Sequence, residues 1–220
     1  SNTALKAGDN ATVTLDFSEP VASFSSADDI TVPNLDNGTT SGTLATMTSS
    51  QANDNKTIWT GTFTPTANTE EDINRLLLSN YTDLAGNNGP DNQTEIYVVD
   101  AKSPTATFFI SDTTLRRNDN ATVDLVFSEP VIGFANADII IPNLDQPPHD
   151  NTTASGTLST MISDDNITWT GTFIPAFPIT NTEDWTNRLV LSDNYTDIGN
   201  NTGRSATSEN YMVDDIDPSS

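Results

Sequence analysis

The sequence predicts an all-β fold of two tandem immunoglobulin-like β-sandwich domains in an elongated arrangement. Three observations lead to this prediction. The chain repeats itself at an offset of about 110 residues, each copy consists of short segments rich in Thr, Val and Ile, and Asn, Asp, Gly and Pro separate those segments. Such an offset is too long for a solenoid repeat, and it suits an independent domain of about 100 residues.

Identical runs of residues mark the repeat. Phe17-Ser18-Glu19-Pro20-Val21 recurs unchanged at 127–131, and Trp59-Thr60-Gly61-Thr62-Phe63 recurs at 169–173. Later pairs drift by only a few residues, which places the insertions in loops. The predicted boundaries are domain 1 over residues 1–100, domain 2 over 101–214, and the start of a linker to a following domain over 215–220.

Within each copy, apolar and polar residues alternate over short segments, as in half-buried strands. In the segment 11–17, the odd-numbered residues from Ala11 to Phe17 fall on one face, and 121–127 repeats the pattern. Turn residues bound the other candidate strands of the first copy. These candidates are residues 30–32, 42–47, 57–63, 75–78 and 95–99.

With the strand before them, these segments make about seven short strands per domain, which is the immunoglobulin-like pattern. Residues 104–110 precede the repeated motif in the second copy, and nothing corresponds to them in the first. We therefore expect domain 1 to lack most of its first strand, and the chain to derive from a longer array of similar units.

The composition argues against several classes of function. Because 8 Lys+Arg stand against 31 Asp+Glu, the formal net charge is −23, and so acidic a chain repels nucleic acid and anionic membranes. Cysteine is absent, which rules out disulfides and Cys-ligated metal sites, and His149 is the one histidine. No apolar run approaches the roughly 18 residues of a membrane span, so we expect no direct membrane insertion.

Acidic and amide residues recur at the predicted loop ends. In an immunoglobulin-like sandwich the loops cluster at two ends, and a following domain brings one set of its loops up to the linker. We therefore expect side chains from two domains to converge at each junction. The predicted ligands of the internal junction are Asp9, Asp100, Glu129, Asp197, Asn200 and Asn201.

So dense a cluster of like charges is unfavourable unless it is protonated or neutralised by a cation. Oxygen ligands without His or Cys indicate Ca²⁺, which takes 6–8 oxygens from carboxylates, amides, backbone carbonyls and water. Taken singly, the same residues also suit turns and a solvated surface. Two outer sites, which this chain leaves incomplete, are predicted to use Glu19, Asp83, Asp119, Asp214 and Asp217.

Several runs together resemble the bacterial Ig-like domains of giant repeat adhesins. They are residues 5–13, 17–21, 59–65 and 81–87. The resemblance implies a secreted protein of the bacterial cell surface, of the Gram-negative repeat-in-toxin type, whose tandem domains form a stalk rigidified by Ca²⁺. The last loop of the second copy, residues 197–200, reads as one residue shorter than its counterpart 83–87 in the first copy. Coordination of Ca²⁺ by that loop is therefore less expected at the internal junction.

The leading functional hypothesis is a non-enzymatic extender, or stalk segment. Its partners are the neighbouring Ig-like domains of the same chain, while another part of the parent protein binds a host-cell or surface ligand. The alternative is direct binding of a glycan or surface by an exposed strand face that carries Thr60 and Thr62, or Thr170 and Thr172. An enzyme with a glycosidase-like carboxylate pair is a third class, but no nucleophile–base set or phosphate loop accompanies the acids.

Overall fold

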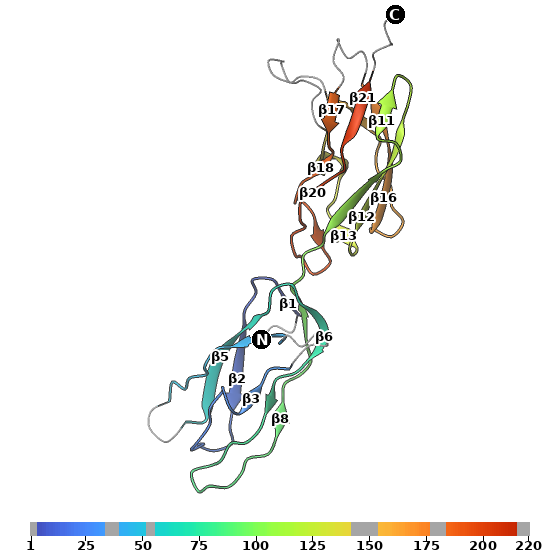
Figure 1. Cartoon of the computed structure of the whole chain (residues 1–220). Helices are drawn as coiled ribbons and strands as arrows, with labels where there is room; N and C mark the ends of the chain where they lie inside the picture. The colour runs from blue at the N-terminus through green and yellow to red at the C-terminus, as the bar shows by residue number, and fades with distance from the viewer. Residues whose placement is uncertain (1–3, 34–39, 52–55, 142–153, 177–183, 215–220) are drawn as a thin grey trace, which may run out of the picture. The chain divides into compact units, whose positions relative to one another are not determined.

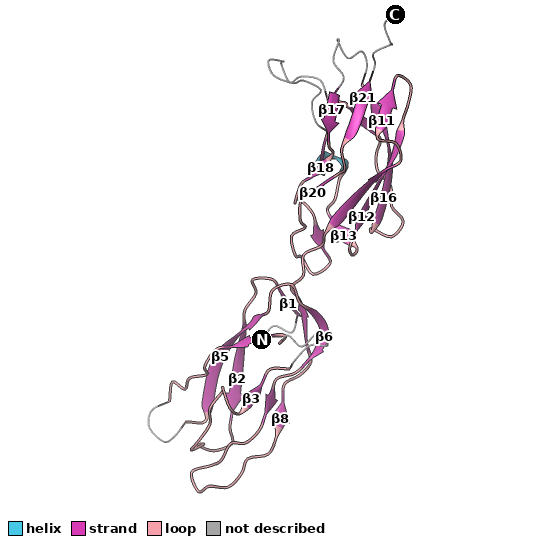
Figure 2. Ribbon diagram, viewed as in Figure 1, coloured by secondary structure: helices cyan, strands magenta, loops and turns pink. Residues whose placement is uncertain are grey.

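The computed structural model describes residues 4–33, 40–51, 56–141, 154–176 and 184–214, with side chains at 184–186 left undescribed. The chain divides into two compact units, Ser1–Lys102 (unit 1) and Ser103–Ser220 (unit 2). The predicted all-β fold is confirmed, since the regular elements of the described residues are strands, apart from one short 3-10 helix, η1 (Asn136–Asp138) (Figures 1 and 2).

The described residues of unit 1 contain nine strand segments. They are β1 (Ala4–Lys6), β2 (Ala11–Asp16), β3 (Ile30–Thr31), β4 (Gly42–Leu44), β5 (Ile58–Pro65), β6 (Glu70–Asn74), β7 (Leu77–Leu78), β8 (Asn92–Gln93) and β9 (Tyr97–Asp100).

The strand segments of unit 2 follow the same order, with three additional ones, β10 at the start and the paired β13 and β19. They are β10 (Ala106–Ile110), β11 (Thr114–Arg116), β12 (Ala121–Phe127), β13 (Val131–Ile132), β14 (Ile139–Ile140), β15 (Gly156–Leu158), β16 (Thr168–Pro175), β17 (Asp184–Asn187), β18 (Val190–Leu191), β19 (Thr196–Asp197), β20 (Ala206–Thr207) and β21 (Tyr211–Asp214).

Two layers of strands make up unit 2. One layer is the sheet β10-β12-β16-β15; the other comprises the sheets β14-β18-β20 and β11-β21-β17. The alternation predicted for 121–127 is confirmed, because Ala121, Val123, Leu125 and Phe127 are all buried and lie in one hydrophobic core. The polar residues between them are more exposed, so β12 presents one face to the core and the other to solvent.

Unit 1 repeats these layers without counterparts of β10 and of the two-stranded sheet β13-β19 in the described residues, where an isolated bridge between Val21 and Asp83 takes the place of that sheet. Its sheets are β2-β5-β4, β1-β9-β6 and β3-β7-β8, and none of its described strands takes the position that β10 has in unit 2. Of the predicted strand 75–78, only Leu77–Leu78 forms a strand, β7, and the preceding β6, which was not predicted, ends at Asn74 in an irregular pairing with β9. The side-chain amide of the buried Asn74 donates a hydrogen bond to the Glu71 backbone carbonyl at 3.1 Å.

A row of aromatic rings links the two layers at the same place in both units. In unit 1 the Trp59 ring packs edge-on against Phe24 at 5.0 Å between centroids, and Phe17 continues the row to Tyr81. The same row in unit 2 runs from Trp169 through Phe134 and Phe127 to Tyr195. The two tryptophans therefore serve in packing, which argues against their use as ligand platforms.

Candidate metal centre

Asp9 and Asp119 close the same tight turn in the two units. The Oδ2 atom of Asp9 accepts a hydrogen bond from the Lys6 amide at 3.2 Å, and the Asp9 amide donates to the Lys6 carbonyl at 3.1 Å. Asp119 makes the same two contacts with Arg116, at 2.9 and 3.0 Å. Gly8, with φ of +83°, allows the backbone to reverse in unit 1. A turn-forming role therefore already accounts for an aspartate at this position.

The structure brings Asp9 and Asp100 to the same end of unit 1. Asp100 ends β9, in register with Lys6 of β1 on one side and Glu70 of β6 on the other. Glu70 was not among the predicted residues, although the acidic run 70–72 signals it. It forms an exposed ion pair with Lys102 at 3.4 Å, and such pairs contribute little stability.

Unit 2 repeats this arrangement at the end of β21. Asp214 is in register with Arg116, whose amide bonds to the Asp119 carboxylate. The structure therefore brings Asp119 and Asp214 together, as it does Asp9 and Asp100. Asp217, the remaining predicted ligand of this end, lies outside the described residues.

Asp83 organises the loop 83–87 at the other end of unit 1. Its Oδ1 accepts hydrogen bonds from the amides of Ala85 and Asn87, both at 2.8 Å, and its Oδ2 accepts one from the Asn87 side chain at 2.7 Å. These hydrogen bonds hold the pKa of Asp83 below its usual value of 3.8, and the bond from the Asn87 side chain has the largest effect. The carboxylate is therefore favoured in its charged form.

The corresponding loop of unit 2 has the same length, so the prediction that it is one residue shorter was wrong. The amide of Asp197 donates to the Asn201 carbonyl at 3.2 Å, just as Asp83 bonds Asn87 four residues away. Asn201 is thus the counterpart of Asn87, and the exposed Asn200, with φ of +70°, is the counterpart of a glycine. The Asp197 carboxylate is buried and accepts both the amide and the side chain of Asn201.

Within each unit the predicted glutamate lies beside the predicted loop aspartate. Val131, two residues after Glu129, pairs with Asp197, and the Glu129 Oε1 atom is buried. In unit 1, Glu19 and Asp83 line one hollow of about 350 Å³, and Val21 pairs with Asp83. Glu19 itself is exposed, unlike the partly buried Glu129.

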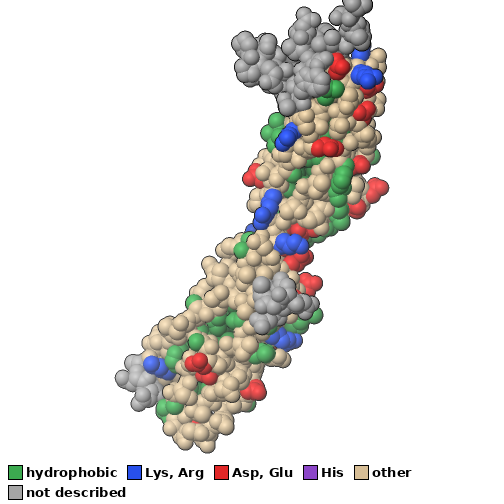
Figure 3. Space-filling view, in the orientation of Figure 1, with side chains coloured by type: hydrophobic (Ala, Val, Ile, Leu, Met, Phe, Trp, Pro, Cys, Tyr) green, Lys and Arg blue, Asp and Glu red, His purple; other side chains and the backbone are tan. Residues whose placement is uncertain are grey.

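The donors collected at the unit ends are carboxylate and amide oxygens, which suit a hard cation such as Ca²⁺. Across the residues that the structure describes, no group of three or more His, Cys, Asp or Glu lies close enough together to hold a metal ion. On the face drawn in Figure 3, red Asp and Glu side chains are spread over each unit without forming one patch.

Acidification is expected to weaken unit 1 through Asp83. The pKa of Asp83 is lower in the folded protein than its unfolded value of 3.8, so the charged carboxylate stabilises the folded state of unit 1. This stabilisation is complete at pH values above 3.8 and is lost as the pH falls through the lower pKa of the folded state. Between pH 7 and pH 3, unit 1 of the unmodified protein should therefore lose more stability than unit 1 of Asp83→Asn. Urea unfolding followed by hydrogen exchange, which resolves the two units, measures this difference. Asp91→Asn, which removes an exposed charge nearby, is the control; equal losses in Asp83→Asn and the unmodified protein would contradict the assignment.

A family model described as a bacterial Ig-like domain matches residues 1–99 and 100–213. No curated protein matches the chain. Among solved structures, FdeC, described as a broadly conserved Escherichia coli adhesin eliciting protection against urinary tract infections, is similar at 13% identity and a TM-score of 0.41. The match covers 97% of this chain and 62% of that one. In the described part of the chain, no helix is long and apolar enough to cross a membrane.

Proposed function

Because the chain belongs to the bacterial Ig-like domain family, with two copies in series, we propose that it is a non-enzymatic extender segment of a larger secreted adhesin on the bacterial cell surface, of the repeat-in-toxin type. The observation that carries this proposal is the repetition of one sandwich with its acids in the same positions: Asp9 and Asp119 in the turn, and Asp83 and Asp197 in the loop. Repeated modules add reach with each copy. Neighbouring domains of the same chain are the partners, and another part of the parent protein binds the target.

The proposal includes Ca²⁺ bound at the linkers. Asp9 and Asp100 of unit 1 are the proposed ligands at the internal linker, together with Glu129 and Asp197 of unit 2. An oxygen-only donor set and the formal charge of −23 support a divalent cation. Extracellular modules bind Ca²⁺ with dissociation constants of about 10⁻⁴–10⁻³ M, so sites of this kind fill outside the cell and stay empty at cytosolic calcium. Stiffening therefore follows secretion.

Calcium is expected to raise the melting temperature of the whole chain. A ligand that binds only the native state at ten times its dissociation constant adds about 1.4 kcal/mol, which moves the melting temperature of a domain of this size by several degrees. Thermal melting in millimolar CaCl₂, in MgCl₂ of equal ionic strength and in EDTA measures the effect. Asp100→Asn should reduce it, and Asp91→Asn, which removes an equal charge elsewhere, should not. The same melting temperature in all three solutions would exclude the calcium site.

Stiffening and metal binding are separable in this test. Small-angle scattering of the unmodified chain in calcium and in EDTA compares the maximum dimension of the molecule. A longer, narrower distribution of distances in calcium is expected of a stiffened linker. If melting responds to calcium while the two scattering profiles coincide, the chain binds calcium without the proposed stalk mechanism.

One observation favours the alternative function of direct ligand binding. Thr60 and Thr62 of β5 are exposed and stand opposite Thr14 and Thr12 of β2 in the same sheet, which gives a hydroxyl-bearing face suited to a polar ligand such as a glycan. A glycan array probed with the whole chain and with Thr60→Val/Thr62→Val tests this candidate. Binding that the double substitution abolishes would support it, and an array without signal would dismiss it.

A further inference from the structure

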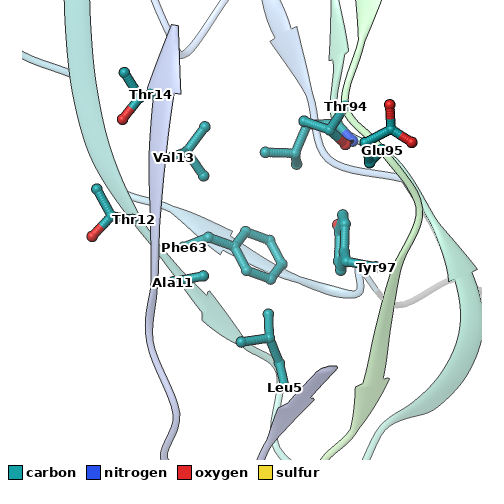
Figure 4. Close-up of a pocket in the computed structure, with 10 residues that line it drawn as sticks. Leu5, Ala11, Thr12, Val13, Thr14, Phe63, Thr94, Glu95 and Tyr97 are labelled. Carbon is teal, nitrogen blue, oxygen red and sulfur yellow. Dashed lines mark hydrogen bonds between the residues drawn. The ribbon is translucent and has the colours of Figure 1, made fainter. Parts of the chain in front are cut away.

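The four-stranded sheet β10-β12-β16-β15 of unit 2 has an outward face as well as a buried one. Val123 and Leu125 belong to the hydrophobic core, so the residues that alternate with them along β12 point to solvent. Figure 4 shows the same alternation in unit 1, where Thr12 and Thr14 of β2 point away from the side on which Val13 lies. The register of the strands then decides which outward side chains of unit 2 are neighbours.

One row across this outward face combines an aromatic ring, a carboxylate and a hydroxyl. Phe109 of β10 pairs with Asp124 of β12, which pairs in turn with Thr170 of β16. Thr170 also forms a bridge with Ile162. The two apolar side chains of the row face water, since Phe109 is 55% and Ile162 is 71% exposed. Side chains of directly paired residues lie about 5 Å apart, so one small ligand can touch several members of the row.

The Asp124 carboxylate has a fixed orientation in this row. Its Oδ1 atom accepts a hydrogen bond from the Thr170 hydroxyl at 2.7 Å. A carboxylate offers about four acceptor positions, so Asp124 has further capacity for donors of a ligand, and such charge-assisted bonds are stronger than neutral ones. An acceptor that is already oriented also costs less entropy to engage.

A hollow of about 280 Å³ adjoins the row at β16. It is lined by Ile162, Ser163, Asp164, Asp165, Thr168 and Thr170. The Asp165 carboxylate accepts hydrogen bonds from the amides of Thr168 and Ile167, both at 2.8 Å. These bonds, of which that from Thr168 has the largest effect, hold the pKa of Asp165 below its usual value of 3.8. The hollow therefore carries a negative charge beside exposed threonine hydroxyls.

Unit 1 has a different row at the equivalent positions. Thr14 stands where Asp124 stands in unit 2, and it pairs with Thr60. Thr48 stands where Ile162 stands, and it forms the bridge with Thr60. The carboxylate and the isoleucine of the row are thus particular to unit 2, although the two sheets share one topology.

We propose that the row and the hollow of unit 2 form a binding site for an uncharged saccharide. This site depends on neither the calcium ligands nor the extender role, and it is distinct from the Thr60–Thr62 face of unit 1. The apolar C–H face of a sugar ring packs against Phe109, while sugar hydroxyls donate to the Asp124 carboxylate and bond the hydroxyls of Thr168 and Thr170. Acidic saccharides are disfavoured, because Asp124 and Asp165 repel them.

A glycan array probed with the whole chain in EDTA tests the site. Phe109→Ala and Asp124→Asn should each weaken the binding of uncharged glycans at least about tenfold, since the first removes the stacking surface and the second removes the charge from the acceptor. Ile140→Ala, which removes a side chain of similar exposure from the other layer, should bind like the unmodified chain. Thermal melting of each variant shows whether unit 2 remains folded.

Four results would overturn the proposal. One is an array on which no uncharged glycan binds, and another is binding that neither Phe109→Ala nor Asp124→Asn weakens. The third is binding confined to lysine-rich peptides printed on the same array, because charge alone would then explain recognition. The fourth is self-association of the chain that Phe109→Ala abolishes, since a second copy would then cover the face. Because EDTA is present throughout, none of these results bears on the calcium proposal.

Discussion

Gly156→Ala is expected to destabilise unit 2 by about 3 kcal/mol, at the upper end of the usual range for overpacked sites. A Cβ atom at this position would lie 2.4 Å from the Ile174 carbonyl oxygen and 2.5 Å from the Phe173 ring. Neither group can retreat, since Ile174 belongs to the paired strand β16, and Phe173 is 1% exposed and packs against Tyr211. Urea unfolding of the whole chain, with exchange to assign the transition to unit 2, measures the loss.

Gly171→Ala is the matched control in the same sheet. Its Cβ would meet the Met161 Cγ atom at 3.1 Å, and a flexible methionine side chain can move aside. Removing a glycine from a strand also reduces the entropy lost on folding. Gly171→Ala should therefore stay within about 1 kcal/mol of the unmodified protein. Equal effects of the two substitutions would show that the contacts at Gly156 do not constrain the sandwich.

Leu125→Ala and Leu15→Ala are expected to differ although they occupy the same position in the two copies. Leu125 is fully buried beneath β10, and removing such a side chain costs about 2–5 kcal/mol through lost transfer energy and the cavity left behind. Leu15 lies half-buried along the open edge of β2, where water already reaches the space that truncation would enlarge. Its loss should cost unit 1 about 1 kcal/mol.

The free energy of unfolding of each unit, measured from urea midpoints in the two variants, checks this contrast. Thr122→Ala and Thr12→Ala, at exposed and equivalent positions on the same strands, are controls and should both have small effects. A loss at Leu15 as large as that at Leu125 would mean that the edge of β2 is closed in solution.

Strand positions could be predicted from the sequence because alternation is a local property. Successive side chains of a strand point to opposite faces, so the apolar residues of 121–127 reveal their buried face without reference to any partner. The interruption between β6 and β7 could not be predicted in this way. It depends on the Asn74 side chain, which bonds backbone carbonyls of its own strand and of β9, more than twenty residues further along the chain.

The candidate metal ligands, too, could be predicted only in part from the sequence. Repetition of the sequence identified Asp9 with Asp119 and Asp83 with Asp197, and the structure brings the predicted neighbours together at the ends of each unit. It also shows a role that the spacing alone did not distinguish, because these carboxylates accept hydrogen bonds that shape their own turns and loops. Glu70 joins Asp100 only through the pairing of β6 with β9.

By itself, the sequence determined that the chain is all-β, that it contains two copies of one domain, and that its acids recur at the same points of both. These properties follow from local alternation and from comparison of the chain with itself. Only the tertiary structure decided that Asp197 is buried where Asp83 is not, and that Val123 and Leu125 have no exposed surface where Val13 and Leu15 are half-buried. The physical reason is that burial and strand pairing arise from contacts between segments distant in sequence, and one additional strand changes the exposure of every side chain beneath it.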